Sequence, residues 1–169
     1  MAPLGPDNAT LLVKTYREGM AAMAGHDLVI EVTRWEANVD LAAGTIELST
    51  DPRSLEVREG LRGVKPLTDK DRDEIRRNID EKVLHGRPIT FRSRIVRASA
   101  RLHVEGDLTL AGSTRPITAN LDLDAAGRVS GTIPLTQSDW GIKPYRGLMG
   151  ALRVRDAVEI VIEGRLPAA

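Results

Sequence analysis

PITFRSRIV (88–96), RLHVEGDLTLAG (101–112), PITANLDLD (116–124) and RVSGTIPLTQ (128–137) are consecutive stretches that share one pattern. In each, apolar residues recur at every second position, with polar or charged residues between them. Successive side chains of a β-strand point to opposite faces, so this period of two predicts strands with one apolar and one wetted face. The links between the stretches are short and turn-like. The sequence therefore predicts an antiparallel meander of four strands.

Alternating stretches also flank the meander. Thr10–Tyr16 and Thr45–Thr50 predict short strands, and Arg153–Leu166 predicts a long last one. His26–Leu41 changes the parity of its apolar residues near Thr33, which indicates a bulge or bend. Eight or nine antiparallel strands close most readily into a barrel, because closure removes exposed edges. We therefore predict a mainly β fold, a single closed antiparallel eight-stranded lipocalin-like barrel.

One helix is predicted, inserted in the barrel at about residues 69–84 (DKDRDEIRRNIDEKVL). Thr68 stands where an N-cap should, with Asp71 three residues later as in a capping box. Its apolar stripe is narrow, with residues four apart: Ile75, Ile79 and Val83. A stripe this narrow predicts a lid or plug at one barrel end.

Length and composition restrict the class of protein. A chain of 169 residues fits one domain, predicted at residues 10–166 after a flexible lead-in at 1–9. The 24 basic and 24 acidic residues cancel, which argues against a nucleic-acid partner. Cysteine is absent, so disulfides and thiolate metal sites are excluded. Without a signal-peptide pattern or an apolar span, we expect a soluble, cytoplasmic protein.

The order of several short motifs carries a family resemblance. HDLVIEV (26–32), RPITFRS (87–93), VEGDLTLAGSTRPIT (104–118), SDWGI (138–142) and VRDAVEIVIEG (154–164) follow one another along the chain. In this order they resemble the YceI-like family of lipocalin-like β-barrels, which bind polyisoprenoid or other amphiphilic lipids in the lumen. The resemblance covers about residues 10–166 and implies a lipid ligand.

The sequence offers no convincing catalytic motif. His26, His85 and His103 lie far apart and do not form a metal-binding spacing. No serine lies in a Gly-x-Ser-x-Gly elbow, and no phosphate-binding loop is present. We therefore predict neither a cofactor nor a metal nor an enzyme. A hydrolase-like site using His26 with a nearby acid such as Asp139 is the minor alternative.

Lipid binding in the lumen is the favoured function. An eight-stranded barrel is just wide enough to be filled by side chains or to hold one small ligand. Small residues at inward positions and few aromatic residues favour a cavity. The candidate lumen wall and mouth comprise Trp35, Phe91, Ser93, Leu102, Leu108, Ile133, Trp140, Ile142, Leu148 and Met149. The alternative is a filled barrel that acts as a protein-interaction or stress-response module, expected to form a homodimer.

Overall fold

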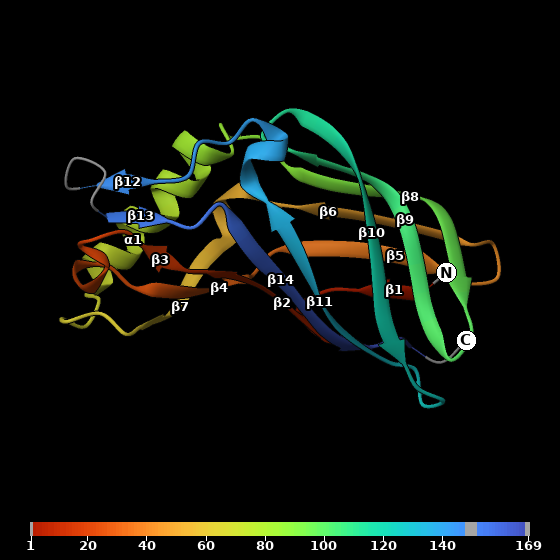
Figure 1. Cartoon of the computed structure of the whole chain (residues 1–169). Coiled ribbons are helices and arrows are strands. Elements are labelled where there is room, and N and C mark those ends of the chain that lie inside the picture. Colours follow the sequence, from red (N-terminus) through yellow and green to blue (C-terminus); the bar gives the residue numbers. More distant parts are fainter. Residues whose placement is uncertain (1, 148–151, 168–169) are drawn as a thin grey trace.

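The computed structural model describes residues 2–147 and 152–167 and shows a mainly β protein with one α-helix (Figure 1). The described strands are β1 (Ala2–Leu4), β2 (Ala9–Thr15), β3 (Arg17–Glu18), β4 (Asp27–Val32), β5 (Trp35–Asp40), β6 (Thr45–Thr50), β7 (Leu55–Leu61), β8 (Ile89–Ala98), β9 (Arg101–Leu110), β10 (Ser113–Leu123), β11 (Arg128–Thr136), β12 (Arg146–Gly147), β13 (Leu152–Val154) and β14 (Ala157–Arg165). The helices are η1 (Ala22–Ala24), η2 (Pro52–Ser54), α1 (Asp69–Asn78), the π-helical η3 (Ile79–Val83) and η4 (Gln137–Trp140).

The predicted four-strand meander is confirmed. Strands β8, β9, β10 and β11 pair antiparallel in chain order, and β14 continues the ladder beyond β11. Their inward faces carry the alternating apolar residues, such as the buried Leu102, Val104 and Leu108 of β9. Burial of every second side chain therefore sets the register of this part of the sheet, as the sequence indicates.

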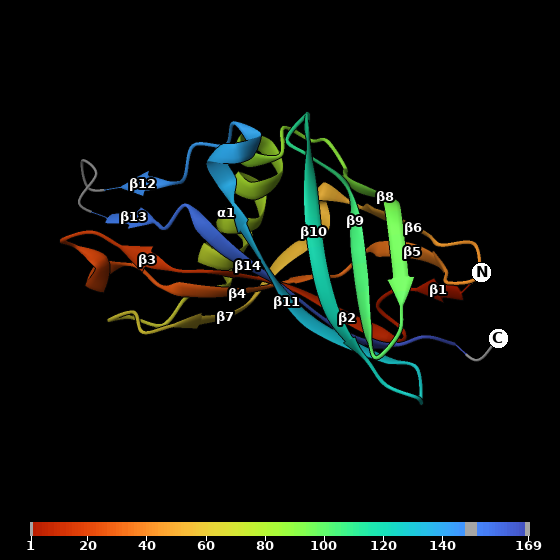
Figure 2. The same cartoon turned by 45° about the vertical axis from the view of Figure 1, so that its right-hand side comes forward.

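The prediction of a closed eight-stranded barrel is wrong. The main sheet has 11 strands in the order β1-β5-β6-β8-β9-β10-β11-β14-β2-β4-β7. It is an open half-barrel, since β1 and β7 are its two edges and do not pair with each other. A further three-stranded sheet, β12-β13-β3, lies at the end far from the termini (Figures 1 and 2).

The main sheet divides where two stretches of chain bend beside each other, one between β4 and β5 and the other between β6 and β7. The bend expected near Thr33 divides the stretch 26–41 into β4, which pairs with β2 and β7, and β5, which pairs with β1 and β6. Opposite it, η2 separates β6 from β7. The amide of Thr33 donates to the Ser54 carbonyl (2.9 Å), and that of Asp51 donates to the Arg34 carbonyl (3.0 Å). The two halves of this hairpin consequently join different neighbours, and the ladder is not continuous around a ring.

Residues 2–4, inside the segment expected as a lead-in, form β1. Pro3 pairs with Asn38 of β5, and the Leu4 side chain is buried. The sequence contained no alternation long enough to indicate this three-residue strand, since partner contacts rather than periodicity determine it.

The helix begins where its capping residues predict. Thr68 accepts a hydrogen bond from the Asp71 amide (3.1 Å), and the Asp71 carboxylate accepts one from the Thr68 amide (3.0 Å). The reciprocal pair satisfies two amides that the first helical turn leaves free. After Asn78 the chain continues as the π-helical turn η3 and stops at His85-Gly86, both with positive φ.

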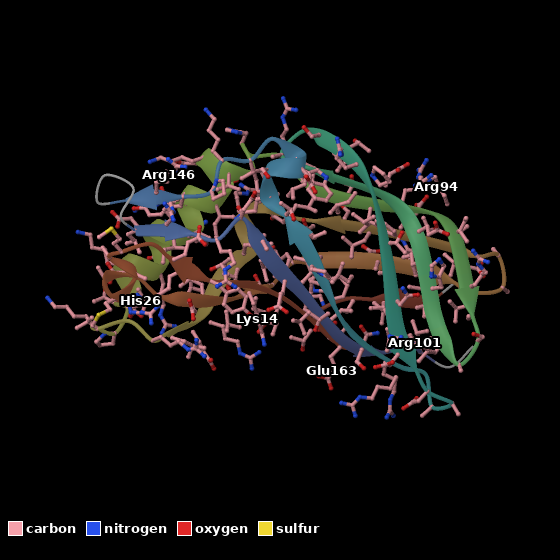
Figure 3. The ribbon with its side chains drawn as sticks, in the orientation of Figure 1. Lys14, His26, Arg94, Arg101, Arg146 and Glu163 are labelled. Carbon is pink, nitrogen blue, oxygen red and sulfur yellow. The ribbon has the colours of Figure 1, made fainter. Side chains whose placement is uncertain are left out.

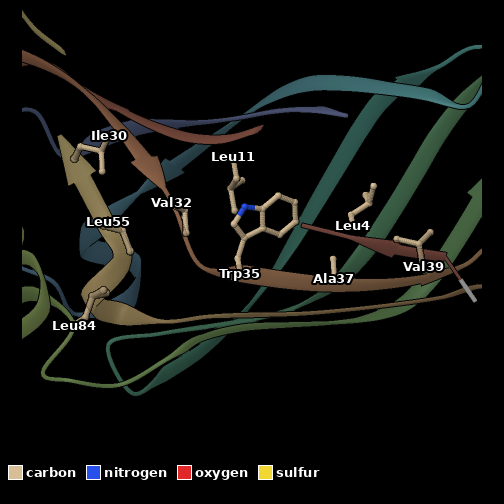
Figure 4. Close-up of a cluster of buried hydrophobic side chains, with 9 residues drawn as sticks. All are labelled: Leu4, Leu11, Ile30, Val32, Trp35, Ala37, Val39, Leu55 and Leu84. Carbon is tan, nitrogen blue, oxygen red and sulfur yellow. The ribbon is translucent and has the colours of Figure 1, made fainter. Parts of the chain in front are cut away.

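One apolar cluster runs along the inside of the half-barrel, from Val39 of β5 to Leu55 of β7 and Leu84 (Figure 4). Trp35 lies at its centre with 6% of its surface exposed, and Leu4, Ala37 and Val39 pack beside it. Five other members of the cluster, Leu11, Ile30, Val32, Leu55 and Leu84, also line a cavity, so the packed core and the open volume adjoin each other. No helix in the described ranges has the length and apolar character needed to cross a bilayer.

Candidate functional site

A cavity of about 740 Å³ occupies the half-barrel on the side of α1. Its wall is made by inward apolar side chains from most of the long strands, such as Val13, Ile46, Val104, Leu121 and Ile160. Cavities that hold one small molecule typically measure ~300–1,000 Å³ and are mostly apolar. The size and the lining both suit an apolar ligand.

The helix closes one side of this cavity. Ile75, Ile79 and Val83, the residues of the predicted narrow stripe, all line it. Leu84, just after η3, is among the most deeply buried side chains and belongs to the Trp35 cluster as well as the cavity wall. The apolar stripe thus faces the lumen, as expected for a lid.

Most polar groups on the cavity wall lie at the end formed by β3, β13, η1 and the start of α1. They are Thr15, Arg17, His26, Lys65, Asp71, Glu74 and Arg153. The Thr15 hydroxyl is buried and has no hydrogen-bond partner. A buried hydroxyl without a partner carries a desolvation cost, which a polar ligand atom would relieve. The cavity is therefore amphiphilic, with an aliphatic interior and a polar end.

A buried carboxylate organises this polar end. Asp27 is 7% exposed and accepts a hydrogen bond from the Arg17 amide (2.8 Å). Its carboxylate also lies 4.0 Å from the Arg17 guanidinium and 3.7 Å from that of Arg62. The Arg17 guanidinium donates further to the Gly25 carbonyl (3.1 Å). These contacts hold β3, the η1 loop and the end of β7 together at the cavity end.

Four of the ten residues predicted for the lumen line this cavity. Phe91 and Leu108 come from the neighbouring strands β8 and β9, Ile133 from β11, and Ile142 from the segment after η4. Phe91 and Leu108 are direct register partners, so their side chains lie on the same face of the sheet.

Four others lie elsewhere. Trp35 is in the filled cluster, and Leu102 packs in a second core cluster with Val104 and Leu121. The Ser93 hydroxyl accepts a hydrogen bond from the Ile46 amide (2.8 Å), within the strand ladder. The Trp140 indole, 4% exposed, donates to the Leu108 carbonyl (3.0 Å) and fixes η4 against β9.

Leu148 and Met149 lie outside the described residues. Several lining residues were absent from the predicted set, notably Val13, Leu28, Ile160 and Ile162. These residues lie at the alternating apolar positions of the first strands and the last strand. That alternation predicted the strands, but it was not used to predict which residues line the lumen. Sequence separation hid their proximity, because β14 pairs with β2 across most of the chain length.

The histidines do not converge. The His26 ring nitrogen Nε2 lies 2.5 Å from the Lys65 carbonyl oxygen, whereas Asp139 belongs to η4 and is exposed. His103 is on the outer face, where hydrogen bonds to Asn120 (2.7 Å) and Glu105 (3.1 Å) raise its pKa above 6.5. Within residues 2–147 and 152–167, no group of three or more His, Cys, Asp or Glu side chains could hold a metal ion.

The family model of the YceI-like domain matches residues 13–166. The chain belongs to the YceI-like family. This confirms the resemblance that the sequence motifs indicate, over nearly the same range. No curated protein sequence matches this YceI-like protein.

Solved structures share the fold at low sequence identity. The crystal structure of Burkholderia cenocepacia BcnA matches with a TM-score of 0.66 at 16% identity, covering 95% of this chain and 96% of that chain. The Campylobacter jejuni YceI protein matches with a TM-score of 0.55 at 12% identity, covering 80% and 82%. A mutant of the CJ YceI protein crystallised with a monobromobimane guest gives 0.54 at 14% identity, with the same coverage.

Proposed function

We propose that this YceI-like protein binds an amphiphilic lipid with a polyisoprenoid or acyl chain in the half-barrel cavity, without catalysing a reaction. The observation that carries the proposal is the apolar cavity of about 740 Å³ beneath the helix. Membership of the YceI-like family supports it. The described wall consists mostly of aliphatic side chains, so it suits binding by burial.

Burial of an apolar chain supplies enough free energy for binding. Each buried methylene contributes about 0.8 kcal/mol, so ten of them contribute about 8 kcal/mol before the cost of association. Contacts of this kind distinguish chain length and width more than head-group identity. The structure therefore supports a class of ligand, defined by its apolar chain.

The arrangement of polar groups sets the orientation of the ligand. Leu11 and Val32, which lie away from Thr15 along the paired strands β2 and β4, line the cavity and also belong to the Trp35 cluster. The opposite end holds Thr15, Arg17 and Lys65. We place the apolar tail against the Trp35 cluster and the head group beside Thr15, whose hydroxyl can then make its missing hydrogen bond.

The test is native mass spectrometry of freshly purified protein, followed by solvent extraction and lipid analysis. We expect a discrete adduct that extracts as an isoprenoid or acyl compound. Ala119→Phe should abolish it, because Ala119 lies on the cavity wall and the added ring would occupy the lumen. Substitution of the inward-facing glycines Gly106 and Gly131 would not test occupancy of the lumen. Even a Cβ atom would clash with the Phe91 side chain at Gly106 and with the Leu121 side chain at Gly131.

The matched control is Thr118→Phe, one position along the same strand, where the side chain faces outward and is exposed. This variant should retain the adduct. A clean apo mass for the wild type, or an adduct that survives in Ala119→Phe with the fold intact, would contradict the proposal. The apo mass would favour a protein-interaction module without a small-molecule ligand, whereas the surviving adduct would place the ligand outside the cavity.

A further inference from the structure

The most exposed large apolar side chains gather at one end of the molecule. Met20 is fully exposed (100%), Met23 is 72% exposed and Val64 is 69% exposed. Leu61 and Tyr145 are also exposed. In Figure 3 the sulfur atoms lie at this left-hand end, beyond His26. Adjacent apolar side chains in solvent are costly and mark a surface that contacts an apolar partner.

Backbone contacts hold the segments that carry these residues together. The Val64 amide donates to the Met23 carbonyl (3.4 Å), and the Arg17 side chain bonds to both the Gly25 and the Arg62 carbonyls. On the other side β13 pairs with β3, and the Val154 amide donates to the Tyr145 carbonyl (3.0 Å). We call this surface the apolar tip, formed by Met20, Met23, Leu61 and Val64.

The tip is surrounded by an excess of positive charge in a chain whose net charge is zero. Segments 17–27, 61–67, 143–147 and 152–154 carry two acidic residues, Glu18 and Asp27, against six basic ones: Arg17, Arg62, Lys65, Lys143, Arg146 and Arg153. Asp69, Lys70 and Asp71 at the start of α1 lower this excess by one charge and leave it positive. Figure 3 shows Arg146 at this end.

Three of the basic residues are free to meet an anionic partner. Lys65, Lys143 and Arg146 have no ion-pair partner among residues 2–147 and 152–167, and all three are exposed. Exposed methionines and aliphatic residues with cations beside them match the composition of surfaces that enter the interfacial layer of anionic bilayers.

The tip is continuous with the cavity. Ala24, Gly25, His26 and Lys65 line the cavity and are neighbours of Met23 and Val64 in the chain. The polar end of the cavity therefore lies beside the apolar tip. A molecule seated on the tip would bring this end of the cavity to the partner surface.

We propose that the apolar tip docks this YceI-like protein on an anionic lipid bilayer. Met20, Met23 and Val64 enter the interfacial layer, and Lys65, Lys143 and Arg146 lie against the headgroups. Docking by the tip depends on the exposed side chains and not on an occupied cavity, so it goes beyond the proposed lipid binding and fails or succeeds independently of it.

The test is co-sedimentation of the full chain with vesicles of phosphatidylcholine and phosphatidylglycerol in equal parts, and with vesicles of phosphatidylcholine alone. We expect binding to the anionic vesicles that weakens as salt is added, since exposed charges are screened. The double variant Met20→Ser, Met23→Ser should reduce partitioning at least about tenfold, because two side chains lose their apolar burial. Val64→Ser should reduce it less.

The matched control is Leu41→Ser with Ile95→Ser. Both residues are exposed and apolar but lie outside the tip, and this double variant should bind vesicles like the wild type. Ala119→Phe should also bind normally, which separates docking from cavity occupancy. Wild-type protein that ignores anionic vesicles, or a folded Met20→Ser, Met23→Ser variant that binds unchanged, would overturn the proposal. The proposal would also be overturned if the wild type forms a dimer and does not bind vesicles, and the dimer is lost in the Met20→Ser, Met23→Ser variant. The tip would then be covered by a second copy of this chain.

Discussion

Asp51 stands at the bend that separates β6 from β7. Its side chain accepts a hydrogen bond from the Arg53 amide (2.8 Å) as the N-cap of η2, and it lies 3.1 Å from the Arg34 guanidinium. These interactions, led by the backbone hydrogen bond, lower the pKa of Asp51 below 3.8. Ser54, only 1% exposed, donates to the Arg34 and Asp51 carbonyls. A few polar side chains thus hold the corner at which the sheet forks.

Asp51→Asn tests this residue. Because the folded pKa is depressed, ionised Asp51 contributes stability above pH 3.8, and that contribution is lost as pH falls through the folded pKa. At neutral pH we expect the variant to lose about 1 kcal/mol, since the amide can still cap η2 but loses the ion pairs. Urea unfolding at neutral and acid pH measures this.

The gap between the two proteins should shrink in acid, where Asp51 is protonated. The control is Ser49→Ala on the outward face of β6, which should change the stability little at any pH. A gap that stays constant down to strongly acid pH would refute the role of the ionised carboxylate.

At the scale of elements, α1 protects the open edge of the sheet. β7 is an edge strand, and unpaired edges invite association with other strands. The Arg72 guanidinium of α1 donates to the carbonyls of Val57 (3.4 Å) and Arg58 (3.2 Å) on β7. The helix consequently forms part of the cavity wall and also covers the β7 edge. In a closed barrel this edge would be paired with another strand.

Arg72→Ala should lower the free energy of unfolding by about 1 kcal/mol, through loss of two long charge-assisted hydrogen bonds. It should also speed hydrogen exchange of the β7 amides, because the helix opens more often. Exchange followed by mass spectrometry on peptides that cover Leu55–Leu61 gives the measurement. Arg77→Ala, on the exposed side of the same helix, is the control. Equal exchange in the two variants would show that Arg72 does not hold the helix on this edge.

At the scale of the whole molecule, the interior combines a packed core with a cavity. The core is packed around Trp35, and the cavity beneath α1 adjoins it, since Leu11, Ile30, Val32, Leu55 and Leu84 belong to both. A packed core gives the fold a stable base, while an apolar cavity leaves side chains without packing partners and lowers stability. A bound chain would restore those contacts.

We therefore expect delipidated protein to be less stable than protein given an apolar chain. Farnesol or palmitic acid at a free concentration about 100 times its Kd should add about 2.7 kcal/mol, since a ligand that binds only the folded state stabilises it by mass action. Thermal unfolding with and without each compound measures the gain. Ala119→Phe should show a smaller gain, and an equal gain would place the binding site outside the cavity.

Much of this protein follows from local sequence pattern. The period of two predicts the meander β8–β11, the parity change near Thr33 predicts the bend, and Thr68 with Asp71 predicts the start of the helix. The motif order predicts the family, and the stripe of Ile75, Ile79 and Val83 predicts a lid. The lipid ligand, the homodimer and the compartment stay predictions.

The closure of the sheet and the content of the lumen were decided only in three dimensions. Alternation shows which side chains point inward, but it does not show which strands become neighbours after a bend, so the half-barrel was mistaken for a closed ring. It also does not show how deep an inward residue lies. Trp35 and Phe91 share the same inward pattern, yet Trp35 is packed among residues from distant strands and Phe91 borders the cavity. Contacts between segments far apart in the chain determine that difference, and no local pattern records them.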